Sequence, residues 1–278
     1  MYLRPSTLDE AIQNLAQHGG QVLAGGTDFY PALGDRVPTG PLVDITRVKE
    51  IRGIAFEKDF IRIGGLTTWS EILSAPLPRC FDALKSAARE IGSIQIQNRA
   101  TIAGNLCNAS PAADSVPPLL ALDAEVELIS SAGKRRVALA DFIVGNRKTL
   151  RQPNELLASV IVPRDVEDAK SAFVKLGARR YLVISIAMVA AVIAVDDKRL
   201  VSDARVAVGS CSATARRLTK LERTLLGTPA QAGLEKIAAA EHLELLAPID
   251  DVRATADYRR DAALTLVRRA LDACVGSS

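Results

Sequence analysis

Histidine and cysteine are scarce in this chain of 278 residues, and their scarcity narrows the chemistry that the sequence can support. Protein sites for zinc and for iron–sulfur clusters are built mainly from closely spaced cysteine and histidine side chains. The four cysteines are scattered and form no C-x-x-C motif, and only two histidines are present. The sequence therefore predicts no metal centre within the chain and disfavours a catalytic relay that depends on histidine.

Long apolar runs and blocks of like charge are missing as well. No segment reaches about 18 consecutive apolar residues, so we expect no transmembrane helix, and the N-terminus lacks the apolar core of a signal peptide. The net charge is +3, and the basic clusters are too short for a nucleic-acid surface. With 48% apolar and 24% charged residues, the composition is typical of a soluble globular protein, which we expect in the cytoplasm.

The N-terminal stretch carries the signals of a compact βαβ-like unit. Thr7 and Glu10 have the spacing of a capping box, which opens a helix. We expect this helix to stop at Gly19. The apolar segments 21–26 and 41–45 follow as predicted strands.

A second block begins near residue 54 and combines strands with amphipathic helices. Thr68 and Glu71 form another capping box, and residues 80–92 have a strong helical pattern. Residues 93–114 are polar and rich in Asn, Ala and Ser, which predicts a long loop, and long loops inside compact domains are usually functional. The remaining predicted elements of this block are a strand at 60–65, a short helix at 116–122, and strands at 124–130, 135–139 and 155–163.

The pattern changes after a predicted hinge at residues 163–165, where strands are followed by a run of helices. That order indicates a separate α+β domain at the C-terminus. The predicted strands lie at 171–180, 185–195 and 204–210, and the predicted helices at 215–226, 229–246 and 257–274.

Two glycine-bearing segments, "LAGGTD" (23–28) and "TIAGN" (101–105), are candidates for binding a phosphate group. Neither G-x-G-x-x-G nor a P-loop motif occurs in the chain. Successive backbone N–H groups at a glycine turn can still bind an anion, and glycine leaves room for a close approach. Taken alone, either segment is more often an ordinary turn. Two such segments that converged would be able to hold the diphosphate of a dinucleotide.

The order of four segments resembles a known family. "LAGGTDFYPAL", "NRATIAGNLCNASPAAD", "KLGARR" and "DVRATADYRR" follow one another as in the FAD-binding medium subunit of the molybdenum hydroxylases, the xanthine dehydrogenase and carbon monoxide dehydrogenase family. The resemblance extends over nearly the whole chain. It implies an α+β fold, with an FAD-binding domain of the vanillyl-alcohol-oxidase (PCMH) type and a small α/β C-terminal domain of three strands and three helices.

The resemblance also implies domain boundaries and a set of residues that bind the cofactor. The FAD-binding domain would span residues 1–165, with subdomains of about 1–53 and 54–165, and the C-terminal domain would span 166–278. FAD would lie extended between the two subdomains. The residues that match FAD-contacting positions are Val22, Leu23, Ala24, Gly25, Gly26, Thr27, Asp28, Phe29, Ile91, Thr101, Ile102, Ala103, Gly104, Asn105, Asp114, Leu157 and Lys175.

Two of these residues have roles that the resemblance makes specific. Asp114 would accept hydrogen bonds from the adenosine end of FAD, and Lys175 would lie near the pyrimidine end of the isoalloxazine ring, where its charge stabilises the reduced flavin. Each also has a simpler interpretation. Asp114 precedes a predicted helix that it could cap, and Lys175 lies on a strand from which it could face solvent.

The sequence departs from the family pattern at several positions. The usual second motif is Thr-Ile-Gly-Gly-Asn, and Ala103 replaces its first glycine. This exchange would weaken FAD binding if the backbone there needs a positive φ, and would be neutral otherwise. Some relatives carry a [4Fe–4S] insert, but residues 42–97 contain only Cys80, so no such cluster is expected. Tyr181 is a weak candidate for the tyrosine that some relatives place across the flavin, and Cys107 is interpreted as structural.

The predicted function is that of an electron-transferring FAD subunit without a catalytic side chain or metal of its own. The family resemblance implies a hetero-oligomer in which a molybdenum-cofactor subunit oxidises the substrate and a [2Fe–2S] subunit passes the electrons to this chain. FAD would then deliver them to a terminal acceptor. One alternative is a free-standing FAD-dependent oxidoreductase with its own small-molecule substrate. A second is a non-enzymatic scaffold that has lost FAD, against which the intact "AGGTD" and nearly intact "TIAGN" segments speak. The sequence names neither the organic substrate nor the acceptor.

Overall fold

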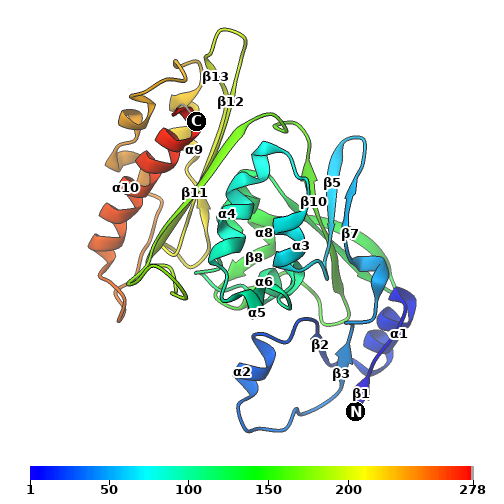
Figure 1. Cartoon of the computed structure of the whole chain (residues 1–278). Coiled ribbons are helices and arrows are strands. Elements are labelled where there is room, and N and C mark those ends of the chain that lie inside the picture. Colours follow the sequence, from blue (N-terminus) through cyan, green and yellow to red (C-terminus); the bar gives the residue numbers. More distant parts are fainter. Residues whose placement is uncertain (277–278) are drawn as a thin grey trace. The chain divides into compact units, whose positions relative to one another are not determined.

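The structure is a computed structural model that describes residues 1–276, and these residues form two compact units (Figure 1). Unit 1 comprises Met1–Ala75, Ser93–Ala109 and Ala124–Val162. Unit 2 comprises Pro76–Gly92, Ser110–Asp123 and the chain from Pro163 onward. Two segments that we expected within the first domain, 76–92 and 110–123, thus pack with the C-terminal part of the chain. The sequence-domain boundary at residue 165 stays a prediction.

The start of unit 1 is a small parallel sheet covered by a helix. The helix α1 (Leu8–His18) begins at Thr7, which forms the predicted capping box with Glu10, and it ends at Gly19, whose φ is +60°. Its buried side chains Ala11, Ile12 and Leu15 pack in one core with the sheet. The strands of this sheet, in spatial order, are β1 (Tyr2–Leu3), β3 (Leu42–Asp44) and β2 (Gln21–Leu23), and the short helix α2 (Phe29–Leu33) lies between β2 and β3 in the chain.

The second part of unit 1 is built around a five-stranded sheet. Its spatial order is β4 (Ile54–Phe56), β5 (Phe60–Gly64), β10 (Leu156–Pro163), β6 (Glu125–Ser130) and β7 (Gly133–Ala138). Thr68 caps the helix α3 (Trp69–Ser74) through the second predicted capping box. The remaining elements are the 3-10 turn η1 (Lys49–Ile51), the short helix α8 (Leu139–Phe142), and the paired strands β8 (Ile143–Gly145) and β9 (Lys148–Thr149).

The segment 93–114 is not the structureless loop that its composition predicts. It contains two short helices, α5 (Ile94–Gln97) and α6 (Ile102–Asn108). The weak helix propensity of its Asn, Ser and Gly residues hides them from a sequence pattern. α6 is stabilised instead by burial of Ile102 and Leu106 and by the Thr101 side chain, which caps its first turn.

Unit 2 is an antiparallel sheet with helices on both faces. Its spatial order is β11 (Lys170–Leu176), β12 (Ala187–Val195), β13 (Val201–Gly209) and β14 (Arg216–Arg217). Every residue from Ala187 to Ile193 on β12 is buried, so both faces of this strand are covered. The long helix α10 (Ala256–Val275) packs on β11 and β12, while α4 (Asp82–Glu90) and α7 (Val116–Ala121) also contact this sheet (Figure 1).

Two predicted helices of the C-terminal part are wrong in extent. The segment 229–246 is not one helix, because Pro229 and Gly233, whose φ is +102°, interrupt it. It forms only the 3-10 turns η3 (Leu234–Ile237) and η4 (Ala240–Leu243). The predicted helix at 215 begins later, as α9 (Thr219–Leu225), because Arg216 and Arg217 pair with β13 as a fourth strand. The remaining element of unit 2 is the 3-10 turn η2 (Arg79–Phe81).

Candidate functional site

The first glycine segment is a tight turn between β2 and α2. Gly26 has a φ of +76°, the left-handed conformation that glycine adopts without strain. A Cβ atom at Gly26 would also lie 2.7 Å from the ring of Tyr30. The sequence therefore needs glycine at position 26 for the turn itself, whatever binds there. A bulky substitution at Gly26 would disturb the turn and ligand binding together.

The second glycine segment meets the first through the backbone. A Cβ atom at Gly25 would lie 2.0 Å from the carbonyl oxygen of Arg99. The backbones of these two segments therefore touch at that point, without a side chain between them. Asp28 and Asn108 add a side-chain link, because the Asn108 amide donates a 3.1 Å hydrogen bond to the Asp28 carboxylate. Arg147 donates in turn to the Asn108 oxygen at 2.9 Å. The predicted convergence of the two segments is thus present within unit 1.

The start of α6 is fixed by backbone hydrogen bonds to the segment that leads into α3. The N–H of Ile102 donates to the carbonyl of Thr67, and the N–H of Ala103 donates to the carbonyl of Gly65, at 3.0 and 3.1 Å. The Thr101 hydroxyl accepts from the N–H of Gly104 at 3.1 Å and still carries a proton to donate. Residues 102–105 therefore form the first turn of a helix rather than a loop, and the diphosphate contacts expected of "TIAGN" stay a prediction.

Ala103 fits the backbone conformation at its position. It lies in the helical turn of α6 and is not among the residues with a positive φ. Its methyl group is buried and would lie 3.1 Å from a Cβ at Gly65, so it points into the packed interior of unit 1. The replacement of the usual glycine by alanine thus costs no backbone strain.

The two segments line one cavity of about 260 Å³ in unit 1. Ala24 and Gly25 come from the first segment, and Arg99 and Thr101 come from the second segment and its approach. The other lining residues are Arg4, Thr46, Arg52, Leu66, Thr68 and Asn98. Of its three arginines, Arg4 pairs with Asp44 and Arg52 pairs with Glu71, so Arg99 is the arginine that best suits an anionic group here.

Leu157 lies beneath the second segment. It is buried on β10, where the pairing with β6 shifts register, and its carbonyl oxygen would be 2.4 Å from a Cβ at Gly65. Leu157 therefore supports the backbone that Ala103 contacts. The cofactor contact expected of Leu157 stays a prediction.

In unit 2, Asp114 and Lys175 form a buried ion pair. The Lys175 Nζ donates to the Asp114 carboxylate at 2.7 Å, and the two side chains are 6% and 9% exposed. The other Asp114 oxygen accepts from the Ser185 hydroxyl at 2.6 Å, and Lys175 also donates to the carbonyl of Val183. Burial raises the pKa of the Asp114 carboxyl, and the Lys175 charge opposes that rise.

This pair corrects two of our expectations for the two residues. Asp114 is not the cap of α7, because the residue at that position is Ser115. Lys175 does not face solvent, because Asp114 and the chain around Val183 enclose its ammonium group. The 2.7 Å contact favours a single FAD edge for both side chains over opposite ends of the cofactor. The FAD contacts of Asp114 and Lys175 stay predictions.

A cavity of about 540 Å³ opens beside Lys175 in unit 2. Its wall includes Glu90 near the end of α4, Phe173 on β11 and Arg179. Ile91, which ends α4, is half-buried, and its expected cofactor contact stays a prediction.

The other side chains that the sequence singled out have structural surroundings. Tyr181 is 65% exposed and contacts the guanidinium of Arg180, while Trp69 is fully buried in unit 1. Burial raises the pKa of the Cys107 thiol to about 11, which agrees with a structural interpretation of this cysteine. His242 accepts a hydrogen bond from the backbone of Ala239 through its Nδ1.

Sequence reasoning did not identify Asn108, Arg147 and Ser185 as parts of the two clusters. Asn108 lies within the quoted segment and had a detectable signal, since a side-chain amide so close to a glycine turn is a ready donor. Arg147 and Ser185 are remote in sequence from the residues that they support, and no local pattern indicates them.

Within residues 1–276, no three His, Cys, Asp or Glu side chains are grouped so as to hold a metal ion. Over the same residues, none of the helices combines the length and the apolar character that crossing a bilayer requires.

Two family models match the chain, and together they cover most of it. The model described as "FAD binding domain in molybdopterin dehydrogenase" matches residues 1–165, and the model of the carbon monoxide dehydrogenase flavoprotein C-terminal domain matches 172–274. The chain therefore belongs to the family of FAD-binding medium subunits of the molybdenum hydroxylases, and FAD is its cofactor. The predicted fold, an FAD-binding domain followed by a smaller C-terminal domain, is confirmed.

Individual relatives match along almost the full chain. The putative xanthine dehydrogenase FAD-binding subunit of Escherichia coli is 32% identical, over 100% of this chain and 96% of its own length. The carbon monoxide dehydrogenase medium chain of Hydrogenophaga pseudoflava is 30% identical, over 98% and 96%. A solved structure of carbon monoxide dehydrogenase from the latter organism superposes with a TM-score of 0.88 over the same shares of the two chains. These relatives are parts of larger enzymes, which is consistent with a hetero-oligomer.

Proposed function

We propose that this chain receives electrons from a [2Fe–2S] subunit and passes them to a terminal acceptor, in a cytoplasmic complex whose molybdenum-cofactor subunit oxidises the organic substrate. The observation that carries the proposal within this chain is the buried Lys175–Asp114 pair. It places a cationic donor and an anionic acceptor side by side, next to a cavity in unit 2. The relatives, named as FAD subunits and medium chains of dehydrogenases, support the assembly.

The residues of unit 1 fit the diphosphate of FAD. Gly25 and Gly26 leave this turn without side chains, and the backbone of Arg99 and the ring of Tyr30 pack where their Cβ atoms would lie. Thr101 offers a hydroxyl proton, and Arg99 offers a guanidinium to the cavity that both segments line. Bare backbone, a hydroxyl donor and arginine charge are the features that bind a diphosphate.

The residues of unit 2 fit the imide edge of the isoalloxazine ring. That edge alternates carbonyl acceptors with one N–H donor, and Lys175 and Asp114 present the complementary donor and acceptor. Ser185 orients the Asp114 carboxylate by donating to its second oxygen. The Lys175 ammonium favours negative charge at this edge. Bound FAD supplies the uptake and release of electrons, and the chain positions it.

The side chains of this chain are assigned to binding and orientation rather than to proton transfer. His242 is occupied with the backbone of Ala239, and His18 lies in the last turn of α1. The free-standing oxidoreductase would need a substrate-binding and proton-handling group of its own beside the flavin. The proposed subunit needs none, because oxidation of the organic substrate takes place in another chain.

Purification from the native host with a tag on this chain tests the assembly. We expect a yellow complex with flavin absorption that contains an iron–sulfur protein and a molybdenum-containing chain. A chain that purifies alone and oxidises a small molecule at full rate would establish the free-standing alternative. A chain that takes up no FAD, even in excess, would contradict the assignment of both clusters.

A further inference from the structure

The segment Ser110–Asp123, here called the strap, carries Asp114 and the helix α7 across the sheet of unit 2. All six residues of α7 are buried. A helix this short is not stable by itself, so its position depends on what holds its two ends. The position of Asp114 depends on the same contacts.

Residues 110–117 of the strap contact the sheet and its connections at several points. The N–H of Ser210 donates to the carbonyl of Pro111 at 3.1 Å. Asp114 binds Lys175 on β11. Pro117 packs on bare backbone at the end of β13, because a Cβ atom at Gly209 would lie 2.9 Å from its ring.

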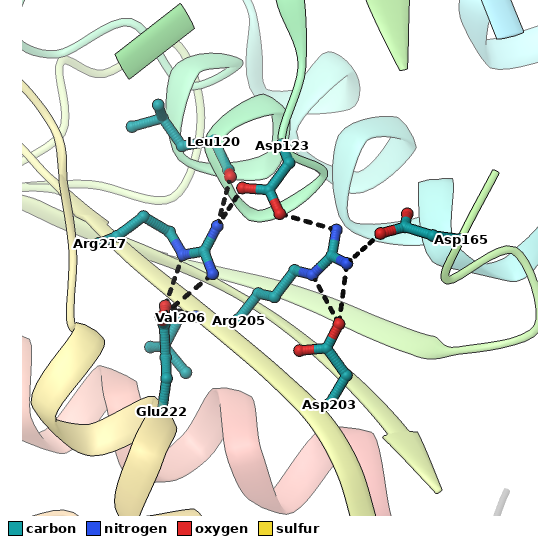
Figure 2. A network of polar contacts seen from close by, with 8 residues as sticks. All are labelled: Leu120, Asp123, Asp165, Asp203, Arg205, Val206, Arg217 and Glu222. Carbon is teal, nitrogen blue, oxygen red and sulfur yellow. Dashed lines mark hydrogen bonds and ion pairs between the residues drawn. The ribbon is translucent and has the colours of Figure 1, made fainter. Parts of the chain in front are cut away.

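The second half ends at Asp123, which bridges two arginines (Figure 2). One carboxylate oxygen accepts from Arg217 at 2.6 Å, and the other lies 3.0 Å from Arg205. Arg217 also donates to the carbonyl of Leu120, which is three residues before Asp123. The end of the strap is thereby joined to β13 and β14 through charged side chains.

Both arginines are themselves fixed to the sheet, as Figure 2 shows. Arg205 is only 6% exposed and pairs with Asp203 and Asp165 at 2.8 and 2.5 Å. Arg217 binds the Glu222 carboxylate through two nitrogens, and Glu222 accepts from the N–H of Val206 on β13. The arginines therefore hold their place whether or not Asp123 is present.

The backbone of Asp123 is left-handed where it makes this bridge. Its φ is +48°, a value that aspartate adopts more often than most residues other than glycine. The Arg205 Nη1 that faces it is buried and lacks an aligned hydrogen bond among the described residues, so charge alone holds that side of the bridge. A residue other than glycine keeps a left-handed backbone where the contacts around it hold it in that conformation.

We propose that Asp123 is a positioning residue for FAD: by tying the end of the strap to Arg205 and Arg217, it holds Asp114 beside Lys175 in the arrangement that receives the flavin. The proposal rests on the proposed function, in which Asp114 contacts FAD. Asp123 acts through Asp114 and touches no cofactor. Loss of the bridge leaves the end of the strap held only by the Arg217–Leu120 hydrogen bond and the burial of α7, and it widens the range of positions that Asp114 samples.

The test is a double-mutant cycle on the FAD dissociation constant of the full-length chain, measured by flavin fluorescence. The variants are Asp123→Asn, Asp114→Ala and the two combined. Asp203→Asn is the matched control. It also removes one carboxylate charge that pairs with Arg205, but Asp203 lies outside the strap. Asp123→Gly is a second variant that fits the left-handed backbone and keeps the test valid if Asp123→Asn folds poorly.

We expect Asp123→Asn and Asp123→Gly to raise the dissociation constant about tenfold, the scale of one lost charge-assisted contact. We expect Asp203→Asn to leave it unchanged, and Asp123→Asn to add nothing once Asp114 is alanine. Faster amide hydrogen exchange across residues 110–123 should accompany the loss. An unchanged dissociation constant in both Asp123 variants, or a full further loss in the Asp114→Ala background, would overturn the proposal. Failure of the wild-type chain to bind FAD would instead overturn the proposed function.

Discussion

The two units present different chemistry to a cofactor. Unit 1 presents backbone, because its two segments meet where Gly25 leaves no room for a Cβ and Gly26 takes a left-handed φ. Unit 2 presents charged side chains, because Asp114 and Lys175 are held together in a buried pair. Unit 1 should therefore be sensitive to added volume and unit 2 to changed charge. Substitutions chosen on that basis can separate loss of fold from loss of FAD.

The largest effect is expected in unit 2. Asp114→Ala leaves the Lys175 ammonium buried without its partner, which should lower the free energy of unfolding by about 3 kcal/mol. Urea unfolding of the FAD-free chain measures the change.

The matched control is the double variant Asp114→Ala, Lys175→Met, which removes both charges. We expect it to regain most of the lost stability, because no charged group is then buried away from water. FAD binding should stay weak. Normal FAD affinity in the double variant would show that the pair is only structural.

A smaller but still large effect is expected in unit 1 from Gly25→Val. The new Cβ would collide with the backbone of Arg99, and such overpacking costs up to about 3 kcal/mol. Gly104→Ala is the contrast, because the only described atom near its Cβ is the Thr101 hydroxyl oxygen, at 2.9 Å. Alanine also gains about 1 kcal/mol over glycine in a helix. Equal destabilisation of the two variants by urea would contradict the backbone contact at Gly25.

Acid should weaken unit 1 through Glu155. Hydrogen bonds from Arg135 lower the pKa of the Glu155 carboxyl below its unfolded value. The resulting stability is present above the unfolded pKa, near 4.3, and it is lost as pH falls through the lower folded pKa. Between pH 7 and pH 3, the free energy of unfolding of Glu155→Gln should fall less than that of the wild type. Parallel curves for the two chains would contradict this assignment.

The smallest effect is expected from thiol chemistry, on which the two units do not differ. Burial raises the pKa of Cys107 in unit 1 to about 11, and of Cys80 and Cys274 in unit 2 to about 12. Burial also raises the pKa of Cys211 in unit 2 to about 11. Alkylation by iodoacetamide at pH 8 should therefore be slow until the chain unfolds. One cysteine that reacts as fast as free cysteine in the folded chain would identify an exposed thiolate.

The sequence predicted the features that depend on neighbours in the chain. The capping boxes at Thr7 and Thr68, the glycine turn after β2 and the continuous apolar run of β12 are local signals, and all four appear in the structure. Helix α6 was missed because tertiary burial, rather than propensity, makes it helical.

The candidate site was predictable as a set of residues but not as an arrangement. Asp114 and Lys175 are 61 positions apart, and no local pattern shows that their side chains meet. The contacts of the strap were missed for the same reason, since Pro117 and Asp123 find their partners on strands far along the chain. Long-range packing decides these contacts, and a single sequence does not display it.

A crystal structure of the chain with FAD bound is the most direct test of the account. The account predicts the Asp114 carboxylate and the Lys175 ammonium on the same edge of the isoalloxazine ring, each within about 3.2 Å of a ring heteroatom. It also predicts the diphosphate against the backbone of Gly25 and Gly26. A structure in which Asp114 binds the adenosine ribose while Lys175 binds the flavin, or in which neither residue touches FAD, would contradict it.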